Sequence, residues 1–253
     1  MSRLAKLAFV VAALAIPAVA YAIDPQSPNS LGAALDGVVQ DASDPEVTQA
    51  VRLLVLLTTL TVLPGLLLLM TPFTRFLIVF ALLRQALGLQ QSPPNQVLVA
   101  LSILLSLVVM QPTIAQVNDG ALQPYLEGQI TTGEAYDRAI GPLREHMITH
   151  TRRSDLGSAI RIAKLPKLET IDQVPTTVVM TGYLLSELHA AFVAGVKVYV
   201  PFLVVDLVVS SVLLGMGMMM LPPVVISLPF KLLVFVLMDG WTLIIVGLAR
   251  GAA

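Results

Sequence analysis

The sequence predicts an all-helical membrane protein in which two long apolar helical hairpins flank a mostly helical polar domain. Hydrophobic residues make up 56% of the 253 residues, charged residues make up 12%, and the mean hydropathy is +0.84. These values lie well outside the range of soluble globular domains. The net charge of -1 gives no basic field for nucleic acid, so we exclude that class of partner. The absence of cysteine excludes disulfides and thiolate chemistry.

The N-terminal residues 1–22 are predicted to be a cleaved signal peptide. Two basic residues precede an apolar run, and small residues recur at Ala20 and Ala22 in two small-x-small cleavage sites. The alternative is a retained membrane helix, but the apolar run is too short to span a bilayer. Residues 23–50, rich in Pro, Gly, Ser and acidic groups, are predicted to form a short extracytoplasmic lead-in.

The first apolar hairpin is predicted at residues 51–116. A Thr-Pro break at Pro72 interrupts it, and Pro93 and Pro94 mark a hairpin turn. The run after this turn is marginal for crossing about 30 Å of hydrocarbon, which needs about 20 residues. Polar or irregular backbone at membrane depth is tolerated where protein or water surrounds it, so we expect these segments to pack against protein.

A polar domain is predicted at residues 117–181, where charged residues are frequent. Helix-start signals occur at Thr132 and at Ser154. The connection around Arg75 and Arg84 contains no acid and is therefore expected on the cytoplasmic side. This orientation agrees with an exported N-terminus and predicts an extracytoplasmic polar domain.

The second apolar hairpin is predicted at residues 182–253. Its tip contains three consecutive methionines followed, after one leucine, by two prolines: Met218, Met219, Met220, Pro222 and Pro223. Methionine side chains are unbranched and polarizable, so they can deform around whatever touches them. The alternative interpretation is ordinary core packing beside a turn.

Five charges are embedded in this hairpin and are predicted to be buried or to contact other subunits: Glu187, Lys197, Asp206, Lys231 and Asp239. A lone charge at the bilayer centre costs roughly 2.5 to 3.5 kcal/mol on insertion scales, so each should have a partner or a water-filled cavity. Counted from the tip, Asp206 lies at the height of Lys231, and Lys197 at the height of Asp239. Lys197 and Asp206 are about 180° apart on an ideal helix, so one interface cannot hold both pairs. At least one charge then faces another subunit or the lumen, although snorkelling near a span end is an alternative for Asp239.

Sequence signals of catalysis are lacking, so we do not expect an enzyme, a cofactor or a metal site. His146 and His150 lie four residues apart, but Glu145 precedes the pair and the H-E-x-x-H arrangement is not met. There is also no phosphate-binding loop, dinucleotide fingerprint or nucleophile elbow. Energy for any transport must come from elsewhere.

Three long strings follow one another in the chain: FTRFLIVFALLRQALGLQQSPPNQVL at 73–98, PFLVVDLVVSSVL at 201–213 and GMGMMMLPPVVISLPFKLLVFVLMDGW at 215–241. Together they strongly resemble the FliP family of flagellar type III export gate proteins. The resemblance covers almost everything after residue 50. The injectisome gate subunits of the SctR type share much of this pattern, but the signal peptide and the LPFKLLVFVLMDGW ending favour the flagellar family.

The resemblance implies a homo-oligomer of several copies, with five expected, that assembles with FliQ and FliR into a helical cone. This cone would form the entrance of the flagellar export channel at the basal body in the bacterial inner membrane. It would pass unfolded flagellar substrates, with FlhA and FlhB nearby on the cytoplasmic side and the polar domain in the periplasm. The three methionines would form a gasket that closes the pore.

The mechanism that we expect is a passive, deformable gate. Close-packed thioethers offer few polar groups to replace an ion's hydration shell, whereas they can repack around an extended polypeptide. Besides the injectisome subunit, the competing classes are a solute transporter with midplane charges and broken helices, and a structural scaffold for basal body assembly.

The two cleavage sites predict a mature chain that begins at Tyr21 or Ile23. Mass spectrometry of the assembled protein should find one of these N-termini. Residues 1–22 found intact in the assembled protein would contradict the prediction.

Overall fold

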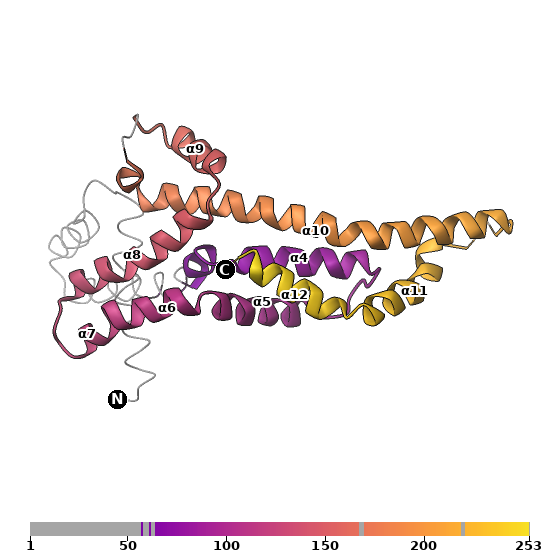
Figure 1. Cartoon of the computed structure of the whole chain (residues 1–253), viewed down its shortest axis with the longest axis horizontal. Helices are drawn as coiled ribbons and strands as arrows, with labels where there is room; N and C mark the ends of the chain where they lie inside the picture. Colours follow the sequence, from indigo (N-terminus) through magenta and orange to yellow (C-terminus); the bar gives the residue numbers. More distant parts are fainter. Residues whose placement is uncertain (1–56, 58–60, 62–63, 167–169, 219–220, 253) are drawn as a thin grey trace, which may run out of the picture. The chain divides into compact units, whose positions relative to one another are not determined.

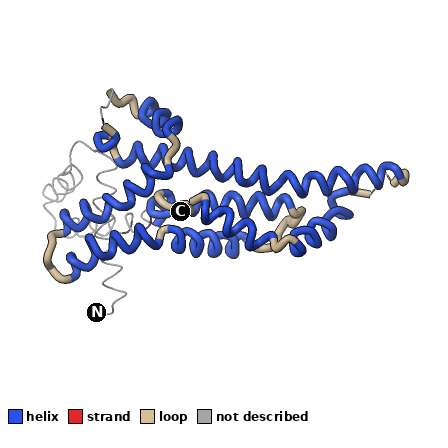
Figure 2. Tube along the Cα trace, in the orientation of Figure 1, coloured by secondary structure: helices blue, strands red, loops and turns tan. Residues whose placement is uncertain are grey.

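The computed structural model describes residues 57, 61, 64–166, 170–218 and 221–252. These residues form helices and connections without a β-strand (Figures 1 and 2), which confirms the predicted all-helical class. The predicted signal peptide, with Ala20 and Ala22, the lead-in, and most of the first apolar run lie outside the described residues.

The chain divides into two compact units. The first unit combines the residues up to Met70 with Pro112–Leu184, and the second combines Thr71–Gln111 with Leu185–Ala253. One helix of 40 residues, α10 (Thr176–Gly215), contributes to both units.

The first unit is built from short helices around one apolar core. Its elements, besides the first turns of α10, are α6 (Gln111–Val117), the π-helix η1 (Asn118–Leu122), α7 (Gln123–Leu126), α8 (Thr132–His150), α9 (Arg153–Ile162) and the 3₁₀ turn η2 (Ile171–Gln173). The core residues are Met70, Met147, Ala159, Val174, Val178, Val179 and Tyr183. They come from α8, α9, α10 and two connecting segments, so this core holds the polar part of the chain together.

Helix α8 begins where the sequence predicts, because a capping box fixes its first turn. The Glu134 backbone N–H donates to Thr131 Oγ1 at 3.4 Å, and the Thr131 backbone N–H donates to Glu134 Oε2 at 2.8 Å. These bonds satisfy backbone donors that the first turn of a helix leaves unpaired. The same hydrogen bonds, from the Thr131 backbone and then from its hydroxyl, lower the pKa of Glu134 below its ordinary value.

Helices α9 and α10 approach closely at Gly182. A Cβ atom at this position would lie 3.1 Å from Leu156 Cα, which is backbone and cannot move aside as a flexible side chain can. Glycine therefore allows the N-terminal part of α10 to contact α9 directly.

The second unit packs four further helical segments beside the rest of α10. They are α4 (Phe73–Ala86), α5 (Asn95–Val109), α11 (Pro223–Leu237) and α12 (Gly240–Arg250). One core cluster joins α4, α5, α10 and the C-terminal segment through Phe76, Val79, Phe80, Leu98, Ala191, Leu248 and Ala252. A second cluster joins the end of α4 to α10 and α11 through Leu83, Ala86, Leu87, Phe202 and Phe235. Figure 1 shows α4, α11 and α12 running alongside this part of α10.

Two glycines allow close contacts in this unit. A Cβ at Gly195 would come within 2.2 Å of Leu82, and a Cβ at Gly240 would come within 2.3 Å of the Phe235 ring. Gly240 opens α12 directly after Asp239, whose backbone is left-handed with φ 48°. There α11 and α12 meet at a bend of 64°.

Two helices in this unit end in the same hydrogen-bonded motif, with a left-handed glycine. At the end of α4, Gly88 has φ 77°, its N–H donates to Gln85 O at 3.0 Å, and Leu89 N–H donates to Arg84 O at 3.1 Å. This is the Schellman arrangement, which satisfies carbonyls that the last turn leaves without partners. At the end of α10, Gly217 has φ 75° and donates to Leu214 O at 3.0 Å.

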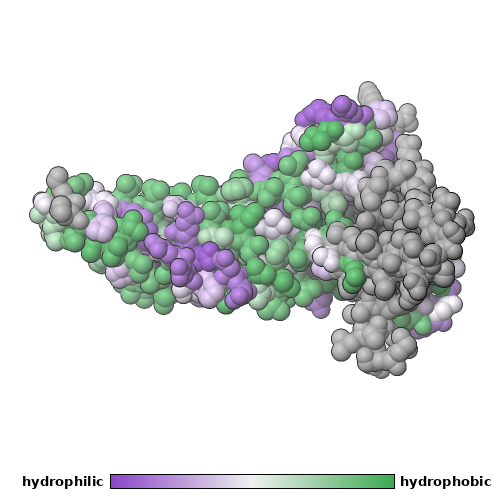
Figure 3. Space-filling model, turned by 180° about the vertical axis from the view of Figure 1, so that it is seen from behind, coloured by the Kyte–Doolittle hydropathy of each residue, from purple (hydrophilic) through white to green (hydrophobic). Residues whose placement is uncertain are grey.

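The helices of the second unit expose large apolar side chains over much of their length. Figure 3 shows apolar residues covering most of the visible face of these helices, with a polar patch among them. On α10, the exposed residues include Phe192, Val196, Val200, Leu207 and Val212. Among the described residues, α10 is long and apolar enough to cross a membrane, and up to three spans are possible if each of two bent helix pairs counts as one. Such apolar exposure is typical of surfaces that face lipid or other subunits.

Candidate functional site

The strongest polar feature of the second unit is a buried network that joins α10, α11 and α4. Lys231 is 3% exposed, and its Nζ lies 2.7 Å from Asp206 Oδ2. It also donates to the carbonyl oxygen of Ala86 at 3.0 Å. The other carboxylate oxygen, Asp206 Oδ1, accepts a hydrogen bond from Ser227 Oγ at 2.5 Å. The network therefore occupies both oxygens of the acid and gives the ammonium two acceptors.

Helical spacing explains how these groups meet. Ser227 and Lys231 are four residues apart on α11 and so share one face. Ala86 is the last residue of α4, where carbonyl oxygens lack intrahelical donors and the helix dipole favours a cation. Lys231 thus stabilises the end of α4 while it pairs with α10. Ser227 and Ala86 were not predicted as part of this site.

A second buried ion pair ties α4 to α10. Arg75 Nε donates to Glu187 Oε2 at 2.9 Å and Arg75 Nη2 donates to Glu187 Oε1 at 2.5 Å, a two-pronged geometry suited to a guanidinium and a carboxylate. Glu187 is 1% exposed. Arg75 Nη1 also donates to the carbonyl oxygen of Gly251, directly after α12. One guanidinium therefore connects three segments that are far apart in the sequence.

The interpretation of Arg75 as part of a short connection is wrong, whereas the cytoplasmic side expected for this segment stays a prediction. Arg75 lies in the first turn of α4, is buried, and forms an ion pair with Glu187. Arg84 also belongs to α4, in its last turn, and donates to Pro93 O at 3.1 Å and to Asn95 Oδ1 at 2.7 Å. The connection itself carries no basic residue, so a count of its charges no longer gives an orientation.

The predicted turn at Pro93 and Pro94 lies between α4 and α5. Pro94 is the residue that precedes the first turn of α5, and its fixed φ is compatible with a helix start directly after it. The two hydrogen bonds from Arg84 close this connection back onto the end of α4.

The tip between α10 and α11 is fixed on both sides. Met218 N–H donates to Leu213 O at 2.9 Å and completes the Schellman motif around Gly217. Pro222 precedes α11 and Pro223 is its first residue, a position where the missing N–H of proline costs nothing. Met218 is 43% exposed in a single chain. Met219 and Met220 lie outside the described residues.

Lys197 and Asp239 behave differently from the other embedded charges. Both side chains are exposed, and neither has an ion pair or a side-chain hydrogen bond to another described residue. The helical spacing that separates Lys197 from Asp206 by about 180° is consistent with this result, because Asp206 faces α11.

The first unit has two further polar features, a histidine pair and a pocket beside Arg144. Within the described part of the chain, no three His, Asp or Glu side chains are grouped as metal ligands would be. The rings of His146 and His150 stack at 4.4 Å between centroids, and His146 packs edge-on against Tyr183 at 6.0 Å. The pair is therefore part of the aromatic packing of α8 against α10.

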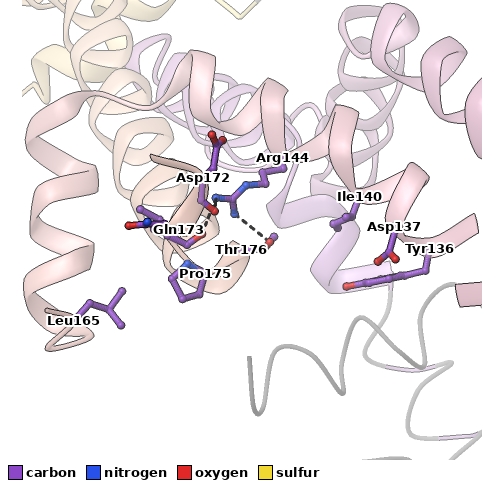
Figure 4. A pocket seen from close by; sticks show the side chains of 10 residues that line it. Tyr136, Asp137, Ile140, Arg144, Leu165, Asp172, Gln173, Pro175 and Thr176 are labelled. Carbon is purple, nitrogen blue, oxygen red and sulfur yellow. Dashed lines mark hydrogen bonds between the residues drawn. The ribbon is translucent and has the colours of Figure 1, made fainter. Parts of the chain in front are cut away.

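A pocket of about 390 Å³ in the first unit lies beside Arg144 (Figure 4). The Arg144 guanidinium donates to the carbonyl oxygens of Ile171, Asp172 and Val174 and to Thr176 Oγ1. These bonds anchor the segment that leads into α10. The guanidinium thus has a structural role. This role was not predicted, because no sequence motif marks its partners, which are three backbone carbonyls and the Thr176 hydroxyl.

Comparison with known proteins matches the model of the FliP family over residues 56–248. The chain belongs to the FliP family. The flagellar biosynthetic protein FliP of Bacillus subtilis is 48% identical over 210 residues, which cover 83% of this chain and 95% of that relative. The protein of the same name from Pectobacterium carotovorum is 48% identical over 80% of this chain and 79% of the relative. The one from Aquifex aeolicus is 44% identical over 81% of this chain and 86% of the relative.

The FliP family match spans the residues of both buried ion pairs and the methionine tip. It begins well after the predicted cleavage sites at Ala20 and Ala22, so the processing of the N-terminus stays a prediction. Flagellar biosynthesis is the role stated in the names of these relatives.

The network around Lys231 predicts that Lys231→Ala harms the protein more than Arg84→Ala. Removing Lys231 leaves Asp206 without its cation, and breaking one partner of a buried pair commonly costs about 3 to 5 kcal/mol. Arg84 serves as the matched control because it is less buried than Lys231 and forms no ion pair with a described residue: one of its hydrogen bonds is part-buried and the other is exposed. We expect Lys231→Ala to lower both the folded protein recovered from membranes and motility. Normal recovery and motility of Lys231→Ala would contradict a stabilising role for the pair.

Proposed function

We propose that this chain is the channel-forming subunit of the flagellar type III protein export gate. Copies of it, with five as the expected number, would assemble with FliQ and FliR into a cone through which unfolded flagellar subunits pass. FlhA and FlhB would lie nearby on the cytoplasmic side. The family and the flagellar names of the relatives support this role over the injectisome alternative.

The observation that carries the proposal is the pairing of α10 with α11 below a methionine tip. The two helices are joined at Asp206 and Lys231, and the rings of Phe202 and Phe235 pack at 6.2 Å between centroids. Between this point and the tip both helices are mostly apolar, and many of their side chains are exposed, among them Leu207, Val212 and Val225. We interpret α10 and α11 as the second hairpin, and α4 with α5 as part of the first. A hairpin anchored at its base and exposed at its tip is suited to line a closure formed by several copies.

The gate would close because of the chemistry of the tip. A ring of thioethers offers an ion few polar groups to replace its hydration shell, so the closed ring would resist ions by hydrophobic gating. An extended polypeptide would pass because unbranched methionine side chains repack around different shapes. This part of the proposal includes Met219 and Met220, which neighbour Met218 in the sequence.

We place the gate in the bacterial inner membrane at the flagellar basal body, with the first unit in the periplasm. The predicted signal peptide supports this orientation because its cleavage leaves the mature N-terminus outside the cytoplasm. The apolar surface of the second unit supports a location among lipid and other subunits.

The ion pairs favour a gate over a solute transporter. A transporter needs midplane charges that can contact a substrate. Here both carboxylate oxygens of Glu187 bind Arg75, and both oxygens of Asp206 bind groups on α11. The carboxylate oxygens of these acids already bind protein groups that hold the helices together, so no carboxylate oxygen of Glu187 or Asp206 is left without a partner to bind a solute.

The proposal predicts that replacing Met218, Met219 and Met220 together by alanine makes the assembled gate leak small ions. Shorter side chains widen the ring, while secretion of flagellar subunits should persist in part. Replacement by leucine roughly conserves volume, a swap that usually costs under about 1.5 kcal/mol in a packed core, so it should leak less. Leucine is less adaptable, and we expect slower passage of polypeptide. Membrane conductance and secretion are measured side by side.

A matched control replaces Leu104, Leu107 and Val108, three exposed apolar residues of α5 and not of the tip, by alanine. This control should assemble without added conductance. An alanine variant of the methionines that assembles in normal amounts and shows no added ion permeability would assign the seal to another part of the protein.

A further inference from the structure

Two opposite charges are exposed on otherwise apolar helices of the second unit. Lys197 on α10 lies among Val193, Val196 and Val200, which are 42%, 60% and 52% exposed. Asp239, at the break between α11 and α12, follows Leu237 and Met238, which are 75% and 58% exposed. Neither charge is paired with another described residue. A charge in such surroundings is costly unless it finds a partner or water, and another molecule can supply that partner.

The two charges do not complete each other within one chain. Asp206 faces α11 because its carboxylate binds Ser227 and Lys231. Lys197 is nine residues earlier on α10, about 180° around the helix, so it lies on the face turned away from α11. Its partner must therefore approach α10 from the other side.

The two charges do lie at the same height along the paired helices. Phe202 of α10 and Phe235 of α11 are in ring contact and so mark one level. Lys197 lies five residues before Phe202, and Asp239 lies four residues after Phe235. Because the two helices are antiparallel, both charges lie on the side of the ring contact that is further from the methionine tip. At a rise of about 1.5 Å per residue, their levels differ by only about 1.5 Å. A neighbouring copy shifted sideways, without a shift along α10, would bring an aspartate to the level of this lysine.

We propose that Lys197 of one copy of this chain pairs with Asp239 of the next copy and sets the register between neighbouring hairpins. The inference rests on the homo-oligomer of the proposed function. Such a contact is head-to-tail, with different surfaces on the two sides, so it can repeat from one copy to the next. Charge complementarity selects a second copy as the occupant because one chain carries both halves of the pair.

The role of this ion pair is specificity more than affinity. Apolar helix faces can slide along one another with little change in buried area, whereas a charge pair satisfies both partners only at one level. Charged groups at interfaces fix register and suppress wrong pairings in this way. In the ring, one repeated pair would align the methionine tips of all copies at one height.

Cross-linking between introduced cysteines tests the inference because the natural chain has no cysteine. Full-length Lys197→Cys and Asp239→Cys variants, carrying different tags, are co-expressed in cells that supply the other gate subunits. A disulfide needs the two Cα atoms within about 7 Å, and an extended lysine paired with an aspartate can exceed this separation, so a short bis-maleimide linker is used. We expect the linker to produce a dimer that carries both tags. A chain with both substitutions should produce a ladder of linked copies.

The matched control replaces Lys197→Cys by Leu214→Cys, since Leu214 is exposed on the same helix but about 25 Å further along it. This control combined with Asp239→Cys should give no linked dimer. A charge reversal adds a second readout: Lys197→Glu or Asp239→Lys alone should reduce co-purification of the two tags, and the two reversals together in each chain should restore it.

The outcomes separate this inference from the proposed function. If differently tagged chains without substitutions co-purify but the Lys197→Cys and Asp239→Cys variants do not link, the ion pair between copies is disproved and the oligomer stands. A cross-link to a different gate subunit would also contradict the inference, because the partner would then be that subunit and not a second copy of this chain. If unsubstituted chains fail to co-purify, the homo-oligomer itself is contradicted.

Discussion

The cost of burying charge is the constraint on which the second unit depends. Arg75, Glu187 and Lys231 are each less than a tenth exposed in a unit whose helices are otherwise apolar. Such ions persist only where each finds a partner of the right geometry, because desolvation costs several kcal/mol per ion. The packing of α4 against α10 and of α11 against α10 is therefore restricted to the one arrangement that pairs them. Apolar contacts between the same helices supply attraction but would tolerate many registers.

The rest of the unit follows from this restriction. Once Lys231 reaches both Asp206 and the end of α4, three helices share one level, and Phe202 and Phe235 are brought into contact nearby. The Schellman end at Gly217 and the Pro222–Pro223 start then define the turn that carries the methionines. The tip is thus positioned from below by polar contacts, while its own surface stays apolar and adaptable. This division of roles is suited to a closure that must be well placed and yet deformable.

Local spacing carries part of the structure. Spacing predicted a helix start at Thr132 and equal heights for Asp206 and Lys231, and in the structure α8 begins at Thr132 and these two charges form an ion pair. Sequence reasoning failed for Arg75, whose partner is 112 residues away and whose role depends on how α4 packs against α10. The contributions of Ser227, of the Ala86 carbonyl and of Gly195 could not be predicted for the same reason, since they exist only once the helices are packed. Met219, Met220 and the cleavage sites lie outside the described residues, so the predictions for them rest on sequence and family.

The most direct test of the central role of buried charge is a double-substitution cycle at Asp206 and Lys231. The thermal unfolding of the detergent-solubilised gate is measured for Asp206→Leu, for Lys231→Met and for the two together. Asp206→Leu leaves the buried Lys231 unpaired and should destabilise by about 3 to 5 kcal/mol, whereas Lys231→Met leaves the partly exposed Asp206 unpaired and should cost less. Removing both ions should recover most of the loss caused by Asp206→Leu. A double variant destabilised by the full sum of the two single changes would show that the pair does not determine the packing of these helices.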